Sequence, residues 1–465
     1  MSAKRARSIA GELSKAKIGD KRLPVRLGKI TEALMARPGA SLPQAMRTEA
    51  GLEAAYRFLN NDAVTPAAIL KPHIEATADR VIAAGGAYCI SDTTELRFGG
   101  TSRKELGPLQ CEGNGFHLHL GLAVAADGSR LPLGILGWEV IVRSAKPKQR
   151  SLTKKSRKAP DSESRKWARV AEAADSAVGG RAPLIHLMDR EADIYVLLAD
   201  LVRRGTRFIV RIAQDRRLVD EEGTIKLFEA LETSVAVATR DVPLSRRRLA
   251  DKPHPRRAQR GARLTFASKT LELRRPATAG TDVAESLRLN FVHVFEKDPP
   301  DGETPVDWKL VTSEPIETAA QVEAVVDGYR TRWVIEEYNK ALKSGCRIER
   351  SQIESLRALL NLLAIVLPVA AQLLALRSLA AVNGSAISTG VLTHAQLGAL
   401  RLMSPIPVPR RPSARQALAA VAALGGHIKN NGPPGWQVLH RGFQDLLRYA
   451  EIWNVLKTRS IRDQS

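Results

Sequence analysis

The chain has 465 residues, 44% of them hydrophobic, which is enough for two or three folded domains and excludes an intrinsically disordered chain. Lysine and arginine number 71 against 49 aspartates and glutamates, giving a formal net charge of +22. A charge of this size favours a polyanionic partner, with nucleic acid ahead of a membrane surface. The cysteines, Cys89, Cys111 and Cys346, are too few and too far apart for a disulfide framework, and they fit a reducing cytoplasm.

Residues 1–70 have the pattern of short helices with basic faces, and they begin without the apolar run of a secretion signal. The clearest pieces are "IGDKRLPVRLGKITEALM" and "GLEAAYRFLNND", in which basic residues flank apolar periodic positions. Solvated helix faces have this pattern by default. In so basic a chain, however, the segment also fits a small helical domain that binds duplex DNA.

After residue 70 the sequence alternates between strand-like and helix-like stretches. "GAYCISD" is a short apolar strand ending at Asp92, and "HLHLGLAVAADGSRLPLGILGWEVI" is a hairpin with its turn at "ADGS". A basic loop at 146–158 and a helix precede a second apolar strand, "PLIHLMD", which ends at Asp189; another helix and the strand "RFIVRIA" follow. This order predicts an α/β fold, a mixed sheet with helices on both faces. As parallel neighbours, the two strands would bring Asp92 and Asp189 together at their carboxyl ends.

From about residue 214 to 307 the sequence is β-like, and we expect a β insertion with a basic loop at 246–263. The apolar stretch 358–376 is long enough to cross a membrane. It contains Asn361, Pro368 and Gln372 and has no second span beside it, which favours a buried core helix. Past about 375 the chain is helical again. We therefore expect domains at 1–70, 71–375 and 376–465.

The stretch "GYRTRWVIEEYNKALKSG" is helical in pattern and unusually rich in charged and aromatic residues. On a helical wheel with Tyr329 at zero, Arg332, Glu336 and Lys343 lie at about 300°, 340° and 320°. Glu337 lies near about 80°, off that face. The wheel thus selects Glu336 as the carboxylate that shares a face with a phenol and two cations. Surface ion pairs at i, i+4 spacing give the same pattern, so this face alone does not define a site.

Asp92, Asp189 and Glu336 would repel one another at close range unless a cation neutralised them. A set of oxygen ligands suits Mg²⁺, with Mn²⁺ as its substitute. Two such ions can activate a water or a 3′-hydroxyl and stabilise the leaving oxygen of a phosphodiester. The other polar groups of the helix face would then hold the scissile strand by its phosphates: Tyr329, Arg332 and Lys343.

The pattern Tyr-x2-Arg-x3-Glu-x6-Lys in "YRTRWVIEEYNKALK" is joined by "SDTTELRF" around Asp92 and "MDREADIYVLL" around Asp189. Further stretches are "IGDKRLPVRL" and "AAYRFLNN" near the N-terminus, "DWKLVTSEPIETAAQ" at Trp308, and "GGHIKNNGPPGW" near the C-terminus. Together these motifs resemble the insertion-sequence-four family of bacterial DDE transposases over nearly the whole chain.

The resemblance implies a ribonuclease-H-like core in which Asp92, Asp189 and Glu336 form the catalytic and metal-binding triad. Members of this family cut a mobile DNA element at both ends, through a hairpin in the known cases, and join the 3′ ends to target DNA. They act in the bacterial cytoplasm on double-stranded DNA, as homodimers in a synaptic complex that the C-terminal helices help to form. The resemblance also implies DNA contacts: Arg22, Arg26 and Arg57 at the element ends, and Trp308 and Trp333 at a flipped base.

Each of these residues also has a simpler interpretation. Asp92 could cap its strand, Asp189 could cap the helix after it, and Trp308 or Trp333 could be a core aromatic. For the whole chain two alternatives stay open. One is a stand-alone nuclease or resolvase of the same fold, and the other is a non-catalytic regulator that binds element ends.

Overall fold

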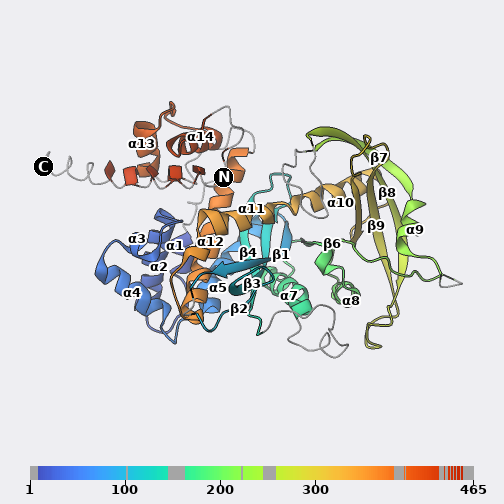
Figure 1. The fold of residues 1–465 in the computed structure, drawn as a ribbon, viewed down its shortest axis with the longest axis horizontal. Helices are drawn as coiled ribbons and strands as arrows, with labels where there is room; N and C mark the ends of the chain where they lie inside the picture. Colours follow the sequence, from blue (N-terminus) through green and yellow to red (C-terminus); the bar gives the residue numbers. More distant parts are fainter. Residues whose placement is uncertain are drawn as a thin grey trace.

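The computed structural model describes residues 9–100, 103–144, 163–220, 224–244, 258–381, 392, 394–428, 434, and 438–453 without 440, 444, 447 and 451. The predicted basic loop at 146–158 lies outside the described residues, and so does 246–257 of the second basic loop. Figure 1 shows a helical N-terminal part, a central sheet with a long β extension, and a small helical C-terminal part.

Five helices open the described chain: α1 (Ile9–Leu13), α2 (Arg22–Ala36), α3 (Leu42–Met46), α4 (Glu49–Leu59) and α5 (Pro66–Ala83). Threonine caps begin two of them, because the side chains of Thr48 and Thr65 accept hydrogen bonds from the N–H groups of Gly51 and Ala68. The predicted helical segment is confirmed. However, α5 runs through the boundary expected at residue 70 and packs on strand β4 (Pro132–Ile141) of the sheet.

Buried polar contacts fasten these helices to the rest of the molecule. Glu12 of α1 pairs with Nδ1 of His73 at 2.8 Å, and Nε2 of His73 accepts the N–H of Ile135 in β4 at 3.2 Å. The side chains of Glu12 and His73 are 2% and 1% exposed. The N-terminal helices are therefore packed against the sheet and share a buried hydrogen-bond network with it.

The sheet has ten strands in the order β2-β3-β1-β5-β6-β10-β9-β8-β7, and β4 also pairs with β3. Strand β5 runs parallel to β1 and β6, and the other pairs are antiparallel. The remaining strand bounds are β1 Ala87–Phe98, β2 Gly107–Pro108, β3 Asn114–Ala125, β5 Leu184–Met188, β6 Arg207–Arg211, β7 Val235–Leu244, β8 Arg260–Arg274, β9 Ser286–Glu296 and β10 Asp307–Thr312. Helix α7 (Lys166–Val178) precedes β5, and α8 (Tyr195–Arg203) connects β5 to β6. This is the predicted mixed α/β fold of the ribonuclease-H-like class.

Strand β1 is longer than the sequence predicted. It does not end at Asp92 but continues to Phe98, because its antiparallel partner β3 holds it in an extended conformation over its whole length. Its parallel partner β5 ends at Met188 and pairs with β1 only as far as Ile90. The second half of β1 therefore stands beyond the carboxyl end of β5.

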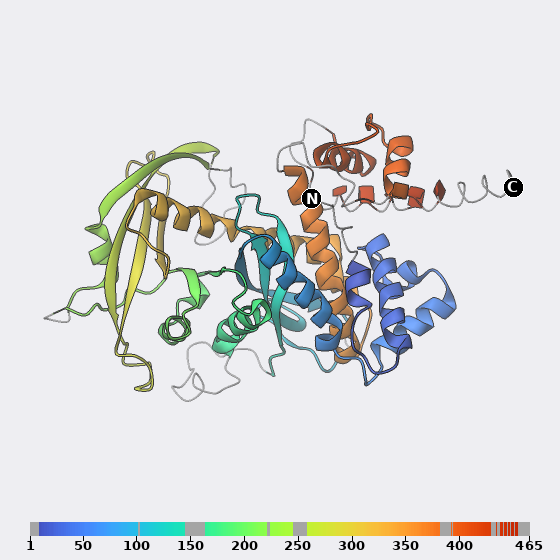
Figure 2. The ribbon, with the colours of Figure 1, turned by 180° about the vertical axis from the view of Figure 1, so that it is seen from behind.

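The predicted β insertion is present, but it continues the core sheet instead of forming a separate β body. Strand β10 pairs with β6 on one side and with β9 on the other, so hydrogen bonds run without a break from the core into the extension. Helix α9 (Leu227–Glu232) packs on β8. Figures 1 and 2 show the extension at the end of the molecule opposite the N-terminal helices.

The long apolar stretch forms α12 (Leu356–Ala381), whose residues Leu356–Ala375 meet the length and composition of a membrane span but are 83% buried. It packs against α5, α4, α2 and the C-terminal helix α14 (Ala414–Leu424), which follows α13 (His394–Met403). The prediction of a core helix is thus confirmed. Hydrogen bonds account for the buried polar residue Asn361 in this apolar helix, since its Nδ2 donates to the carbonyls of Leu59 and Val64 in the N-terminal part.

Candidate active site

Two aspartates lie side by side where β5 ends. The parallel register ends with Ile90 opposite Leu187, and Asp92 and Asp189 each follow two residues later, close enough for the charge of Asp189 to act on Asp92. The two aspartates therefore lie near each other, as expected from the strand order. The reason is geometric, since parallel neighbours present their carboxyl ends at the same edge of a sheet.

The motif "MDREADIY" contains two aspartates with different surroundings. Asp189 caps the short 3-10 helix Arg190–Ala192 through Oδ1, which accepts the N–H of Glu191 at 2.8 Å. The capping interpretation is thus right for one oxygen of Asp189. Asp193 is completely buried, accepts the N–H groups of Ala213 and Gln214 through Oδ2, and pairs with Arg216 through Oδ1. Asp193 therefore fixes the motif to the segment after β6, a role that the sequence analysis missed.

Glu336 does not lie on one uniform helix, as the wheel assumed. Helices α10 (Ala319–Thr331) and α11 (Val334–Lys340) are joined by a tight turn, in which N–H groups bond carbonyls three residues earlier in the chain. A π-helical turn, Ala341–Gly345, follows α11. Because 3-10 and π turns depart from 100° per residue, the prediction of one regular helix is wrong on both sides of Glu336.

Arg332 bridges two of the carboxylates. Its Nη2 donates to Oε1 of Glu336 at 3.3 Å, and its Nη1 lies 4.0 Å from Oδ1 of Asp92. Burial opposes the charge of this guanidinium, but Tyr329, Asp92, Glu336 and Asp189 outweigh burial and raise the pKa of Arg332. The site thus contains a permanent cation that offsets part of its negative charge.

The pKa of Asp92 is raised to about 7. Burial is the largest cause, the negative charges of Glu336 and Asp189 add to it, and Arg332 opposes it. Asp92, Asp189 and Glu336 therefore form one electrostatically coupled group, although they come from β1, the end of β5 and α11.

An aromatic and cationic wall adjoins this group. The buried ring of Tyr329 meets Trp308 of β10 edge to face, with 6.0 Å between ring centroids. The guanidinium of Arg211, from β6, lies 5.7 Å from the centroid of Trp308. Burial raises the pKa of Tyr329, against Arg332 and Arg211. Trp308 is partly buried and packs against the hydrophobic core, so its core interpretation describes part of its surroundings, and its contact with a flipped base stays a prediction. The sequence did not predict that Arg211 lies near the site, because only its place at the end of a strand distinguishes it.

The other residues of the opening helix are placed differently. Lys343 lies half-buried in the π turn, and among the described residues no hydrogen bond or ion pair joins it to the carboxylates. Trp333 is 61% exposed with the Lys340 ammonium 5.9 Å from its ring centroid, so the core interpretation of Trp333 is wrong. Glu337 pairs with Lys340 at 2.9 Å and with Arg377 of α12, whereas Glu336 pairs with Arg332, so the two neighbouring glutamates have different partners.

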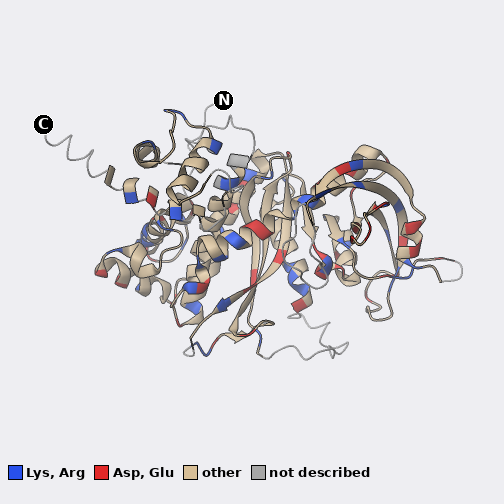
Figure 3. Ribbon diagram, turned by 45° about the horizontal axis from the view of Figure 1, so that its top comes forward, with Lys and Arg blue, Asp and Glu red and all other residues tan. Residues whose placement is uncertain are grey.

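The arginines predicted to bind DNA ends lie on α2 and α4. Arg22, with its side chain 90% exposed, pairs with Asp20 at 2.7 Å, and half-buried Arg26 follows one turn later. Arg57 is 77% exposed and pairs with Glu53. Figure 3 shows lysine and arginine on all three parts of the molecule, so the positive charge is not confined to these helices.

Two family models match the chain. A transposase DNA-binding model matches residues 6–64, which include α1 to α4. A transposase DDE domain model matches residues 154–370, which include Asp189 and Glu336. The chain therefore contains a transposase DNA-binding domain and a transposase DDE domain. Strand β1 with Asp92 lies ahead of the matched DDE stretch, and its pairing with β5 attaches it to that stretch in space.

DDE transposase domains use divalent metal ions for DNA cleavage and transfer, and the chemistry of this site fits such an ion. The side chains that would hold it offer oxygen ligands, the carboxylates of Asp92, Asp189 and Glu336. Beside them lies the amide Oδ1 of Asn339, which is buried without a hydrogen-bond partner among the described residues. Over the described part of the chain, no three His, Cys, Asp or Glu side chains are close enough together to hold a metal. The Arg332 guanidinium bridges Asp92 and Glu336 instead.

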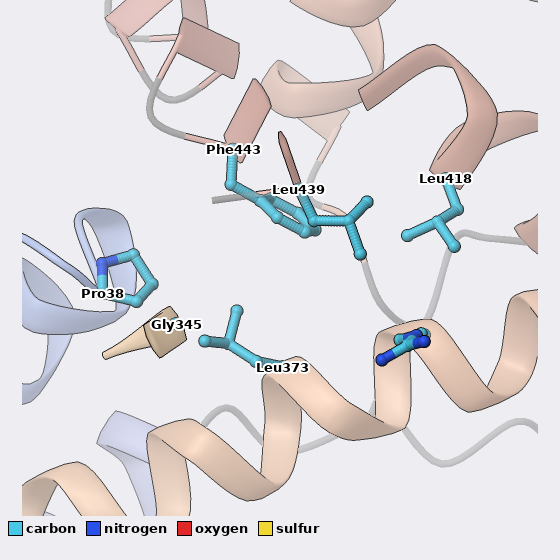
Figure 4. A pocket seen from close by; sticks show the side chains of 7 residues that line it. Pro38, Gly345, Leu373, Leu418, Leu439 and Phe443 are labelled. Atoms are coloured by element: carbon cyan, nitrogen blue, oxygen red, sulfur yellow. The ribbon is translucent and has the colours of Figure 1, made fainter. Parts of the chain in front are cut away.

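A small gap that is partly open to solvent lies apart from the three carboxylates. Its lining is apolar apart from one arginine and comes from all three parts of the chain (Figure 4): Pro38, Gly345, Leu373, Arg377, Leu418, Leu439 and Phe443. No carboxylate lines it, so it is a packing gap where the parts meet and has no place in the chemistry.

Proposed function

We propose that Asp92, Asp189 and Glu336 are the catalytic, metal-binding triad of this transposase. The observation that carries the proposal is the coupling of the three carboxylates around Arg332, since Glu336 and Asp189 both raise the pKa of Asp92. Carboxylates gathered in a buried site destabilise one another unless cations join them, and such clusters are typical of functional sites.

The triad would hold two Mg²⁺ ions, for which Mn²⁺ substitutes. When bound, such ions activate an attacking water or 3′-hydroxyl and stabilise the leaving oxygen. The chain itself positions the DNA: Arg332 and Tyr329 hold phosphate oxygens of the scissile strand, and Lys343 adds positive charge from the π turn. Trp308, beside Tyr329, and exposed Trp333 receive a base that has left the stack.

The reaction that follows is cleavage of both ends of a mobile DNA element by hydrolysis and transesterification, through a DNA hairpin. Joining of the 3′ ends to target DNA completes it. Arg22, Arg26 and Arg57 would bind the element ends, which is supported by the match of their helices to a transposase DNA-binding domain. On the motifs around these residues we also place the chain in the insertion-sequence-four family and expect it to act in the bacterial cytoplasm.

The domain organisation of this proposal is 1–70 for end binding, 71–375 for catalysis and 376–465 for dimerisation. Helix α5 runs through the boundary at residue 70 and helix α12 through the boundary at residue 375, so neighbouring domains share a helix. The proposed homodimer in a synaptic complex would use the C-terminal part, where apolar side chains close together in the sequence are exposed: Leu402, Met403 and Ile406.

The alternatives make different predictions in one assay. A labelled element end is incubated with the protein, target DNA and Mg²⁺. A stand-alone nuclease would cut without joining, and a non-catalytic regulator would bind without cutting. The transposase should cut the end and attach its 3′ strand to the target.

The triad is tested by a pair of neighbouring glutamates on α11. Glu336→Ala should reduce cleavage on the order of 10³-fold or more while end binding stays within a few-fold of wild type, because a lost metal ligand removes chemistry and not docking. Glu337→Ala is the matched control, because Glu337 pairs with Lys340 and Arg377 outside the site. An active Glu336→Ala beside an inactive Glu337→Ala would overturn the assignment.

A further inference from the structure

Asn339 lies in the carboxylate site but has no part in the function proposed above. It follows Glu336 by three residues on α11, so the two side chains are neighbours on one helix face. Its Nδ2 donates to Oδ2 of Asp92 at 3.1 Å, across 247 residues of sequence. This bond joins the helix of Glu336 to the strand of Asp92 at the site itself.

The other end of the same amide is unpaired. In the part of the chain that the structure describes, Oδ1 of Asn339 is buried and accepts no hydrogen bond. Folded proteins pair nearly all buried polar atoms, and an amide oxygen without a donor is destabilising. Ionised Asp92 and Glu336 can only accept hydrogen bonds, and the guanidinium of Arg332 is directed at these two carboxylates.

Rotating the amide of Asn339 by half a turn does not give every polar atom of the side chain a partner. It would place Oδ1 against the carboxylate of Asp92 and leave Nδ2 as the unpaired group. A leucine of similar size would fill the same space without an unpaired atom. Packing therefore does not explain an asparagine at position 339. The bond to Asp92 accounts for Nδ2, and a further hydrogen-bond donor in the site would account for Oδ1.

We infer that Asn339 is a positioning residue of the metal site, an inference that rests on the proposed triad. Its N–H group fixes the carboxylate of Asp92 through Oδ2, which leaves Oδ1 of Asp92 on the side of Arg332. Its carbonyl oxygen accepts a hydrogen bond from a water in the hydration shell of the divalent ion, because Mg²⁺ keeps several of its waters in protein sites. Removing groups that orient metal ligands in this way lowers metal affinity by about 10–100-fold.

The test is the Mn²⁺ affinity of the full-length protein without DNA, measured from the free Mn²⁺ signal by electron paramagnetic resonance. Asn339→Leu keeps the size of the side chain and removes both hydrogen-bonding ends, and it should weaken Mn²⁺ binding about 10–100-fold. Its melting temperature in EDTA should stay equal or rise, because the unpaired oxygen is gone. Asn339→Ala, which cannot clash, should lose the same affinity. Glu337→Gln removes a carboxylate from the same helix outside the site and should bind Mn²⁺ as wild type does.

Asp92→Asn separates the inference from its premise. If Asp92→Asn binds Mn²⁺ like the wild type, the triad itself is wrong. If Asp92→Asn loses Mn²⁺ while both Asn339 variants stay within about threefold of wild type, the triad stands and the role of Asn339 is overturned. Melting temperatures in EDTA that fall in both Asn339 variants together with their affinity would also overturn it, since the residue would then serve packing.

Discussion

Replacing Asp193 with alanine should destabilise the catalytic core strongly, although Asp193 takes no part in the carboxylate site. Its buried carboxylate accepts the N–H groups of Ala213 and Gln214 at 2.7 and 2.8 Å and pairs with Arg216, whose side chain is only 6% exposed. Alanine would leave the guanidinium without a counter-charge and both N–H groups without an acceptor. Removal of one partner from a buried ion pair costs about 3–5 kcal/mol.

At about 2–4 °C per kcal/mol for a core of this size, the melting temperature should fall by roughly 6–20 °C in a thermal scan of the full-length protein. The matched control is Asp327→Ala, because Asp327 is also ion-paired, with Arg330 and with Arg240 of β7, but is 48% exposed. It should change the free energy of unfolding by less than about 1 kcal/mol. Asp193→Asn keeps an acceptor oxygen and should lie between the two. A fall of less than about 2 °C for Asp193→Ala would refute the reasoning.

Three further predictions concern pH, DNA binding and the hairpin. Burial lowers the pKa of His73, and His73 and Arg80 together outweigh burial and lower the pKa of Glu12, so the native state binds fewer protons than the unfolded state. The free energy of unfolding should therefore fall as the pH drops below about 6.5, the pKa of histidine in the unfolded chain. Between pH 7.5 and 5.5 this fall should be smaller for His73→Gln than for the wild type, and an equal fall would exclude His73 as its cause. Arg57→Ala should weaken end binding and make the slope of log affinity against log salt shallower by about 1, and an unchanged slope would remove Arg57 from the DNA surface. Trp308→Ala should leave the first nick largely intact and impair hairpin formation on denaturing gels, whereas equal loss of both steps with a lower melting temperature would make Trp308 a core residue.

Much of the fold follows from local patterns in the sequence. Short apolar runs bounded by turn residues predicted β5 and β6, and the helix between them required a parallel pairing. The same reasoning applied to β1 and β5, which are also separated by a helix, placed Asp92 near Asp189. The apolar stretch of α12 was recognisable as a core helix because a polar residue inside it, Asn361, needs protein partners rather than lipid.

The details of the site depend on tertiary contacts that periodicity does not contain. A wheel assumes 100° per residue, yet a tight turn precedes Glu336 and a π turn follows it, and the hydroxyl of Tyr338 is bonded to the carbonyl of Leu367 in α12. Asn339 lies at about 280° on the same wheel, close to the face of Arg332 and Glu336, so its position near the site could have been predicted from the sequence. An asparagine on a helix is, however, ordinarily a solvated residue. Likewise, no spacing tells which aspartate of "MDREADIY" is buried, because the partner of Asp193 comes from a later strand end.

The contacts of α12 decide where this protein can be recombined with a relative to change its DNA specificity. A graft of residues 1–64 would bring a foreign backbone to the carbonyls of Leu59 and Val64, which the buried amide of Asn361 needs as acceptors. A cut at residue 70 would fall inside α5 and separate Glu12 from its native partner His73. A functional chimera therefore has to exchange α12 and α5 together with the first four helices, or keep the backbone path from Leu59 to Val64 unchanged.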